Sequence, residues 1–306
     1  MADNRIVSEG AKSPRRLFAI LGLASMLLTG CGREFLVLNP AGPVAEIEKR
    51  LIIISTILVL IVIVPVIGLF AYIVNKYRDR PGNNAQYDPE WSESRTLEVI
   101  WWGIPIVIIG ILGTLTARDT FALTRPPSPP SGPMTVEVMS LNWKWYFQYP
   151  EQQVATVNYC VIPTNRPVQF VLTSDAPMNS FWVPELGGQE YTMPGMAMRL
   201  WLQANKPGTY FGHGANFTGE EYAHMHFDVV AKPQDQFSAW VQQTKQTAPA
   251  LTMAGYQNLV HPGLVKQLSF SSYPPNLFKD TVKKSGGMYM KRDLNTLQKA
   301  DTAVKK

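Results

Sequence analysis

The chain has 306 residues, a formal net charge of +5 and 46% hydrophobic residues. This length is enough for one large domain or two modest ones. No Lys/Arg-rich run with interleaved aromatic residues is present, so the positive charge gives no support to nucleic-acid binding. The only cysteines are Cys31 and Cys160, which excludes a framework of several disulfides.

Residues 1–30 have the pattern of a bacterial lipoprotein signal peptide. Arg15 and Arg16 precede a short apolar run, which ends in the Leu-Thr-Gly-Cys sequence of residues 28–31. A basic region before a short apolar region is typical of secretion signals, and small residues before a cysteine resemble a lipobox. We expect cleavage before Cys31 and its acylation with diacylglycerol and palmitate. An uncleaved signal anchor with an incidental cysteine is the alternative.

Two apolar segments predict transmembrane helices, over residues 51–74 and 98–118. The first contains no charged residue and spans about 36 Å at 1.5 Å per residue, enough to cross the hydrocarbon core. Pro65 and Pro105 lie inside these segments. Prolines in membrane helices are tolerated where neighbouring helices compensate, which favours packing against other membrane helices.

The loop over residues 75–97 sets the predicted topology. It carries Lys76, Arg78, Arg80 and Arg95. Cytoplasmic loops are enriched in Lys and Arg, so this loop is predicted in the cytoplasm of a bacterium. The chain is then a multi-pass inner-membrane protein. Its N-terminal segment, residues 31–50, and everything after the second helix are expected in the periplasm, in agreement with a lipidated N-terminus.

A proline-rich hinge is predicted over residues 119–133, before a periplasmic domain. Polyproline segments are semi-rigid and cannot join a strand ladder. Residues 134–232 contain short strand-like runs between turn signals, which is typical of a β-sandwich. The predicted strands cover residues 134–140, 154–161, 168–173, 197–203 and 227–230. Cys160 lies in one of them and is expected to be a small core residue.

Residues 233–306 form a C-terminal extension of different character. Residues 234–246 predict a helix with Phe237, Trp240 and Val241 on one face. The remainder is predicted as helix and loop. The expected fold is therefore a two-helix transmembrane hairpin, an all-β sandwich and a partly helical C-terminal tail.

Several motifs resemble subunit II of haem–copper respiratory oxidases. Residues 138–151 are similar to the aromatic stretch of that family, and residues 178–196 resemble a second family segment. Residues 212–225 have the spacing of the Cys-x3-Cys-x3-His-x2-Met loop that binds dinuclear copper in cytochrome c oxidases. The resemblance implies a cupredoxin-like fold for residues 134–232.

The cysteine and histidine ligands of copper are missing, and only the methionine is kept. The four loop positions hold Gly214, Thr218, Tyr222 and Met225, and Asn179 stands where the family has a further histidine. Copper in such sites requires thiolate and imidazole donors. We therefore predict that this domain binds no metal. A copper-less variant of this kind resembles the quinol-oxidising branch of the family, of bo type.

The resemblance implies a function for the whole assembly. It would oxidise quinol, with ubiquinol favoured over menaquinol, reduce dioxygen to water and move protons outward. Haems and a copper are expected in the partner subunit I, with smaller subunits III and IV as further partners beside membrane lipid. This chain would carry no cofactor or catalytic centre, would not use cytochrome c, and would support assembly and cap subunit I.

Two alternatives remain at this point. The first is a copper-bearing subunit II of a cytochrome c oxidase, which the missing thiolates oppose. The second is a free-standing membrane lipoprotein with a cupredoxin-like binding domain, which would need no partner in the membrane.

Two residues acquire expected roles from the resemblance. Glu98 matches a glutamate of this family that lies near the mouth of a proton-uptake pathway. The alternative is that Glu98 has no role in proton uptake and is an interfacial carboxylate paired with Arg95. Trp143 matches the electron-accepting tryptophan of the cytochrome c branch. Since no copper is expected beside it, we interpret it as a buried or interface aromatic residue.

The histidines near the loop predict no metal site. His224 and His226 are two positions apart, so within one strand they would share a face. A third donor is needed for a convincing site, and His213 is the only nearby candidate. Met225 is expected to be a core residue.

Overall fold

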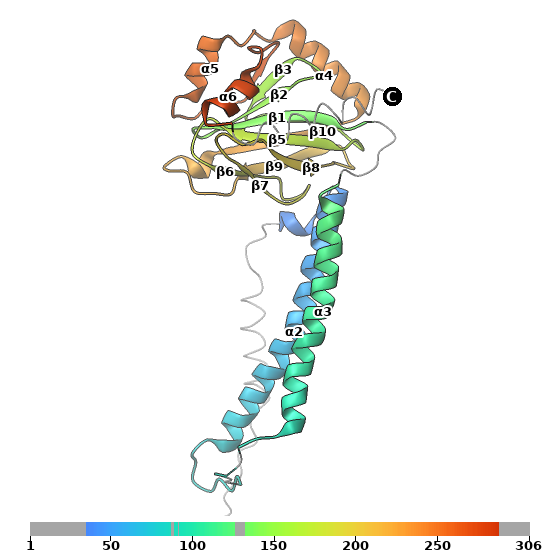
Figure 1. Ribbon diagram of the computed structural model, residues 1–306, viewed down its shortest axis with the longest axis vertical. Helices are drawn as coiled ribbons and strands as arrows, with labels where there is room; N and C mark the ends of the chain where they lie inside the picture. The colour runs from blue at the N-terminus through green and yellow to red at the C-terminus, as the bar shows by residue number, and fades with distance from the viewer. Residues whose placement is uncertain (1–34, 87–88, 91, 126–131, 288–306) are drawn as a thin grey trace, which may run out of the picture. The chain divides into compact units, whose positions relative to one another are not determined.

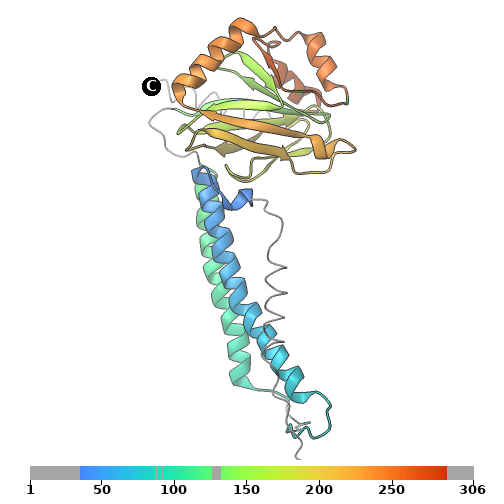
Figure 2. The ribbon, with the colours of Figure 1, turned by 180° about the vertical axis from the view of Figure 1, so that it is seen from behind.

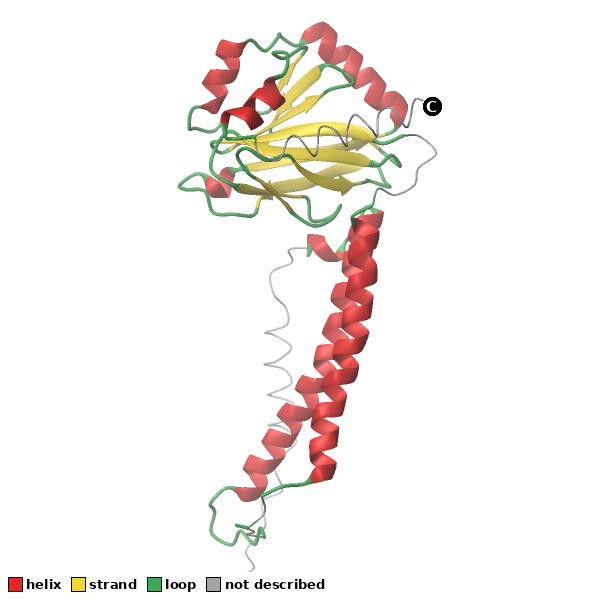
Figure 3. Cartoon of the chain, viewed as in Figure 1, coloured by secondary structure: helices red, strands yellow, loops and turns green. Residues whose placement is uncertain are grey.

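The computed structural model describes residues 35–86, 89–90, 92–125 and 132–287. Cys31 with the predicted signal peptide, and residues 126–131 of the predicted hinge, lie outside this range. Figure 1 shows a pair of long helices and a β-sandwich with helices on it, and Figure 3 shows the same elements by type.

The hairpin consists of α2 (Pro43–Tyr77) and α3 (Arg95–Leu123), preceded by the short helix η1 (Leu36–Leu38). Figures 1 and 2, seen from opposite sides, both show the two long helices side by side. Both are long and apolar enough to cross a membrane, and none of their most apolar stretch is buried by the rest of the chain. Both extend beyond the apolar runs of the sequence, and Pro65 and Pro105 lie within them.

An ion pair joins the two helices. Arg50 of α2 donates to the carboxylate of Asp119 of α3 over 2.9 Å. The Asp119 side chain is 4% exposed and that of Arg50 53%. Because an unpaired buried carboxylate is costly, Asp119 requires this partner, and the pair fixes the contact between the helices at this end.

The sandwich has two mixed sheets. Strand order in the first sheet is β11 (Leu268–Phe270), β3 (Val154–Val157), β2 (Lys144–Tyr149), β1 (Met134–Leu141), β5 (Val168–Ser174) and β8 (Met198–Leu202). Strand order in the second is β4 (Tyr159–Pro163), β10 (His226–Lys232), β9 (Gly208–Gly214), β6 (Asn179–Trp182) and β7 (Glu190–Thr192). The β1–β5 and β4–β10 pairs are parallel, and the other pairs are antiparallel.

Aromatic rings fill the space between the sheets. Phe181 stacks on Phe227 with ring centroids 4.8 Å apart, and Trp145 contacts both rings. Cys160 lies fully buried in the same core, where burial raises the pKa of its thiol, so its predicted role as a small core residue is confirmed. Large buried aromatic residues make this the dominant hydrophobic contact of the domain.

The C-terminal extension forms a third layer. It contains α4 (Gln234–Thr247), α5 (Met253–Val260) and α6 (Leu277–Lys284), and Figure 1 shows them around the β1–β3 side of the sandwich. A second hydrophobic cluster lies between the outer face of the first sheet and α5 and α6. Its buried members are Met139, Leu141, Tyr146, Ala155, Val157, Val171, Leu251, Tyr256, Leu259, Leu277, Phe278 and Val282.

Polar contacts attach this third layer to the sandwich. Asn142 donates to the Val260 carbonyl at 2.9 Å, and the Lys144 ammonium donates to the His261 carbonyl at 2.6 Å. Burial lowers the pKa of Lys144. Tyr256 also donates to the carboxylate of Asp175 at 3.0 Å.

The sequence-based prediction of the extension was partly correct. The helix expected over residues 234–246 is α4, and Phe237, Trp240 and Val241 pack against the same core, with Phe237 and Val241 buried and Trp240 partly buried. Strand β11 was missed, because three residues are too few to show a period-2 pattern.

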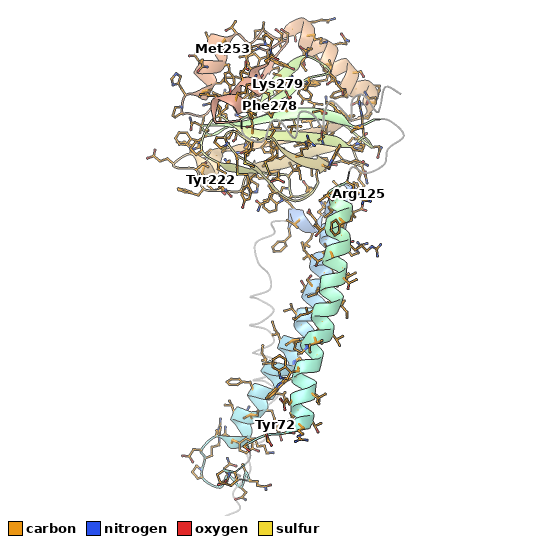
Figure 4. All side chains as sticks on the ribbon, viewed as in Figure 1. Tyr72, Arg125, Tyr222, Met253, Phe278 and Lys279 are labelled. Atoms are coloured by element: carbon orange, nitrogen blue, oxygen red, sulfur yellow. The ribbon has the colours of Figure 1, made fainter. Side chains whose placement is uncertain are left out.

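Removing a large side chain from the third layer tests its contribution to stability. Phe278→Ala should lower the free energy of unfolding by about 3–5 kcal/mol, because it leaves a cavity against the first sheet. Phe278 and its exposed neighbour Lys279 are labelled in Figure 4. The measurement is urea unfolding of the purified chain in detergent, followed by tryptophan fluorescence. The exposed Lys283→Ala is the matched control and should change stability by less than about 0.5 kcal/mol.

Candidate functional site

The predicted copper-loop positions do come together. Strand β9 ends at Gly214, the loop continues through the short helix η2 (Tyr222–His224), and β10 begins at His226. Strand β6, which starts at Asn179, pairs with β9 through Phe181 and Gly214. The loop is closed by the backbone bond from Gly214 N–H to the Met225 carbonyl, at 3.2 Å.

The Asn179 side chain occupies the centre of this arrangement. It is 1% exposed, and its amide nitrogen donates to the sulfur of Met225 at 3.0 Å. Its amide oxygen accepts from the Ser180 backbone N–H at 2.8 Å. A buried amide is stable only when its hydrogen-bonding atoms are satisfied, and both are satisfied here.

Gly214 leaves the space that this amide fills. A Cβ atom at position 214 would lie 2.7 Å from the Asn179 amide oxygen and 2.9 Å from its nitrogen. Distances of that kind are well inside van der Waals contact, so any side chain at position 214 would displace the amide. The glycine and the asparagine therefore depend on each other.

Trp143 lies over the loop from the turn between β1 and β2. Its indole N–H donates to the Thr218 carbonyl at 2.9 Å. A Cβ atom on Gly219 would lie 3.3 Å from the indole ring. Trp143 has a left-handed φ of 62°, a conformation that costs of order 1–3 kcal/mol and persists only when surrounding contacts hold it.

The remaining loop positions differ in exposure. Met225 is 2% exposed, which confirms that it is a core residue. Tyr222, labelled in Figure 4, is partly buried and packs its ring 5.7 Å from that of Phe217. The Thr218 hydroxyl oxygen is buried and makes no hydrogen bond within the described residues. It lines a cavity of about 10 Å³, shared with Trp143 and Asn179, which has room for about one water molecule.

These residues do not fit a dinuclear copper centre. The positions supply an amide, two hydroxyls and one thioether, and none supplies a thiolate or an imidazole. Across the described part of the chain, no group of three or more His, Cys, Asp or Glu side chains could hold a metal ion. The space is also filled, because the Asn179 amide lies where a side chain at position 214 would project.

His224 and His226 do not lie in one strand, so the shared face considered from the sequence does not arise. His224 lies in η2, and His226 is the first residue of β10. His226 instead pairs across the sheet with His213 of β9. The short 3-10 turn breaks the alternation that the prediction assumed, since two residues separated by a helical turn do not project to one face.

Glu98 is placed apart from the loop. It lies in the first turn of α3, on an exposed position of the helical hairpin. A carboxylate in the first turn of a helix interacts favourably with the partial positive charge of that helix end.

The Arg50–Asp119 ion pair was not predicted from the sequence. Both residues lie just outside the two apolar runs, and nothing in the sequence indicates that they are in contact.

Comparisons with known proteins find one matching family and several relatives that cover most of the chain. The family described as cytochrome C oxidase subunit II, periplasmic domain, matches residues 152–232. Quinol oxidase subunit 2 of Bacillus cereus is 45% identical over 261 residues, covering 84% of this chain and 90% of that protein. Cytochrome bo(3) ubiquinol oxidase subunit 2 of Pseudomonas putida is 42% identical over 277 residues, covering 89% and 87%.

The chain belongs to the quinol oxidase subunit 2 family. Ubiquinol oxidase subunit 2 of Acetobacter aceti is a further relative, 40% identical over 284 residues that cover 90% of this chain and 91% of that protein. The sandwich is thus the cupredoxin-like domain of a terminal quinol oxidase subunit, as predicted. Family membership implies a haem-bearing subunit I as partner and disfavours both alternatives raised from the sequence.

A double-mutant cycle tests the dependence between Gly214 and Asn179. Gly214→Ala should lower the free energy of unfolding by about 1–3 kcal/mol, because the added methyl group overlaps the buried amide. In an Asn179→Ala background the same substitution should cost less than about 0.5 kcal/mol, since the overlapping atoms are gone. Urea unfolding of the four proteins measures the coupling. Strict additivity of the two substitutions would show that the residues are independent.

Proposed function

We propose that this chain is the non-redox subunit of a proton-pumping quinol oxidase. The observation that carries the proposal is the Asn179 amide, which is hydrogen-bonded to Met225 and fills the place of a copper-loop side chain opposite Gly214. A copper relay serves an electron donor in the periplasm. A quinol donor is dissolved in the membrane and needs no such relay in this domain.

In this proposal subunit I performs the chemistry. Two quinols are oxidised to two quinones with release of four electrons and four protons, and the reduction of one dioxygen to two waters takes up four electrons and four protons. Haems and a copper in subunit I would carry the electrons, and smaller subunits III and IV complete the assembly. The sandwich caps subunit I on the periplasmic side of the bacterial inner membrane and supports its assembly.

Purification through a tag on this chain tests the proposal. Haem should co-purify with the chain, and the complex should consume oxygen with a short-chain ubiquinol as donor. Reduced cytochrome c should give no oxygen uptake above background. A haem-free chain would instead favour the free-standing lipoprotein, and turnover with cytochrome c would favour the copper-bearing alternative.

We further propose that Glu98 lies at the entrance of a proton-uptake route from the cytoplasm. Support comes from its position in the first turn of α3, beside the predicted cytoplasmic loop. Ionisable groups near membrane depth are frequently part of proton pathways. Arg95 lies in the same first turn, so the alternative role of Glu98 is an ion pair with Arg95 at the membrane interface.

Substitution of this carboxyl group distinguishes the two roles. Glu98→Gln should slow quinol-dependent oxygen uptake by about tenfold or more and reduce proton release from vesicles, because the amide cannot exchange a proton. The exposed loop substitution Glu93→Gln is the control and should leave both rates unchanged. Full turnover and pumping in Glu98→Gln would assign the residue a purely interfacial role.

We also propose that Cys31 is the N-terminal residue of the mature chain and that its acyl groups anchor this end of the chain in the periplasmic face of the membrane. The support is the ordered sequence of basic region, apolar run and Leu28–Cys31 box. Intact-mass measurement should give a chain that begins at Cys31 and carries a diacylglycerol and one further acyl group. A mass that matches the unprocessed chain would contradict cleavage.

A further inference from the structure

One face of α2 carries two shallow, open grooves in succession. The upper groove, of about 330 Å³, is lined by Pro40, Glu46, Lys49, Arg50, Ile53 and Ile54. The lower groove, of about 510 Å³, is lined by Ile57, Leu60, Ile61, Val64 and Pro65. Their lining residues recur at intervals of three and four, so both grooves lie along one stripe of the helix.

The upper groove is charged. Glu46 lies three residues before Lys49 and four before Arg50, which places the three side chains side by side on the helix surface. Arg50 is also bonded to Asp119 at 2.9 Å, which holds its guanidinium in place and leaves 53% of its side chain exposed. With Asp119 included, two cations face two anions, and the net charge of the site is zero.

The apolar part of this stripe begins in the upper groove at Ile53, continues through the lower groove, and has the length of one bilayer leaflet. From Ile53 to Val64 the helix rises about 16 Å at 1.5 Å per residue. One leaflet of the hydrocarbon core is about 15 Å thick. The change from charged to apolar lining falls between Arg50 and Ile53, where the uncharged run of α2 begins.

We propose that this face of α2 binds one zwitterionic aminophospholipid of the periplasmic leaflet. Its phosphate lies against Lys49 and Arg50, its ammonium group against Glu46, and an acyl chain follows the stripe from Ile53 to Val64. The inference rests on the proposed orientation of α2, with residue 50 toward the periplasm.

Charge matching favours an aminophospholipid over other occupants. An anionic headgroup without an amine would leave Glu46 facing negative charge. A transmembrane helix of a partner subunit would fit the lower groove, but its apolar surface would leave Lys49 and Glu46 desolvated without partners. A molecule with separated positive and negative groups above a hydrocarbon chain complements the lining of both grooves.

Native mass spectrometry of the tagged complex tests the proposal, with phosphatidylethanolamine, phosphatidylglycerol and phosphatidylcholine as probes. The complex should retain phosphatidylethanolamine in preference to the other two, because phosphatidylglycerol has no amine and the quaternary ammonium of phosphatidylcholine has no N–H to donate to Glu46. Lys49→Gln should weaken its retention about fivefold, as expected for one lost cation worth about 1 kcal/mol. Glu46→Gln should abolish the preference for phosphatidylethanolamine over phosphatidylglycerol, because the ammonium partner is lost.

Two controls keep the result interpretable. Lys49→Arg keeps the charge and should retain the lipid. Lys76→Gln removes a cation at the opposite end of α2, near the Tyr72 labelled in Figure 4, and should leave retention unchanged. Equal retention by all variants, or a partner helix occupying both grooves in a structure of the complex, would overturn the proposal. Oxygen uptake measured on the same samples reports separately on the oxidase function.

Discussion

The Asn179 amide between β6 and β9 is the interaction on which the account of this domain depends. It bonds Met225 and the Ser180 backbone, and it occupies space that exists only because position 214 is glycine. Around it the cupredoxin-like architecture is complete, with Trp143 still bonded to the loop at Thr218. The domain has the cupredoxin-like fold of its family, and its centre is a packed, hydrogen-bonded part of the protein interior.

The packing of this loop supports the proposed structural role of the domain, separate from electron transfer. The loop needs no metal to hold it, because the amide, the indole of Trp143 and the Gly214–Met225 backbone bond fix its path. The third layer is attached to the turn that carries Trp143. There Lys144 donates a hydrogen bond to the His261 carbonyl, and Asn142 donates one to the Val260 carbonyl. A domain built in this way suits a subunit that supports and caps a partner rather than one that passes electrons.

Much of the fold was predictable from local signals. Uncharged runs of helical length gave α2 and α3, and the spacing of α4 gave its buried face at Phe237 and Val241. The copper-loop positions could be identified because residues 212–225 have the length and spacing of the family's loop even though its cysteines and histidines are absent. Other features depend on tertiary contacts. Asn179 and Gly214 are 35 positions apart, and Arg50 and Asp119 are 69 positions apart, so no local pattern shows that they are in contact. The pairing of His213 with His226 depends on the shape of the loop between β9 and β10, which the sequence did not indicate.

The most direct test of the central claim is the copper content of the purified complex. The complex is incubated with excess Cu²⁺ under reducing and then oxidising conditions, desalted, and its metals are counted by plasma mass spectrometry against haem. The account predicts only the single copper expected in subunit I, with the same count in the Asn179→Ala variant. Two additional coppers per complex, lost when the sandwich is removed by proteolysis, would contradict it.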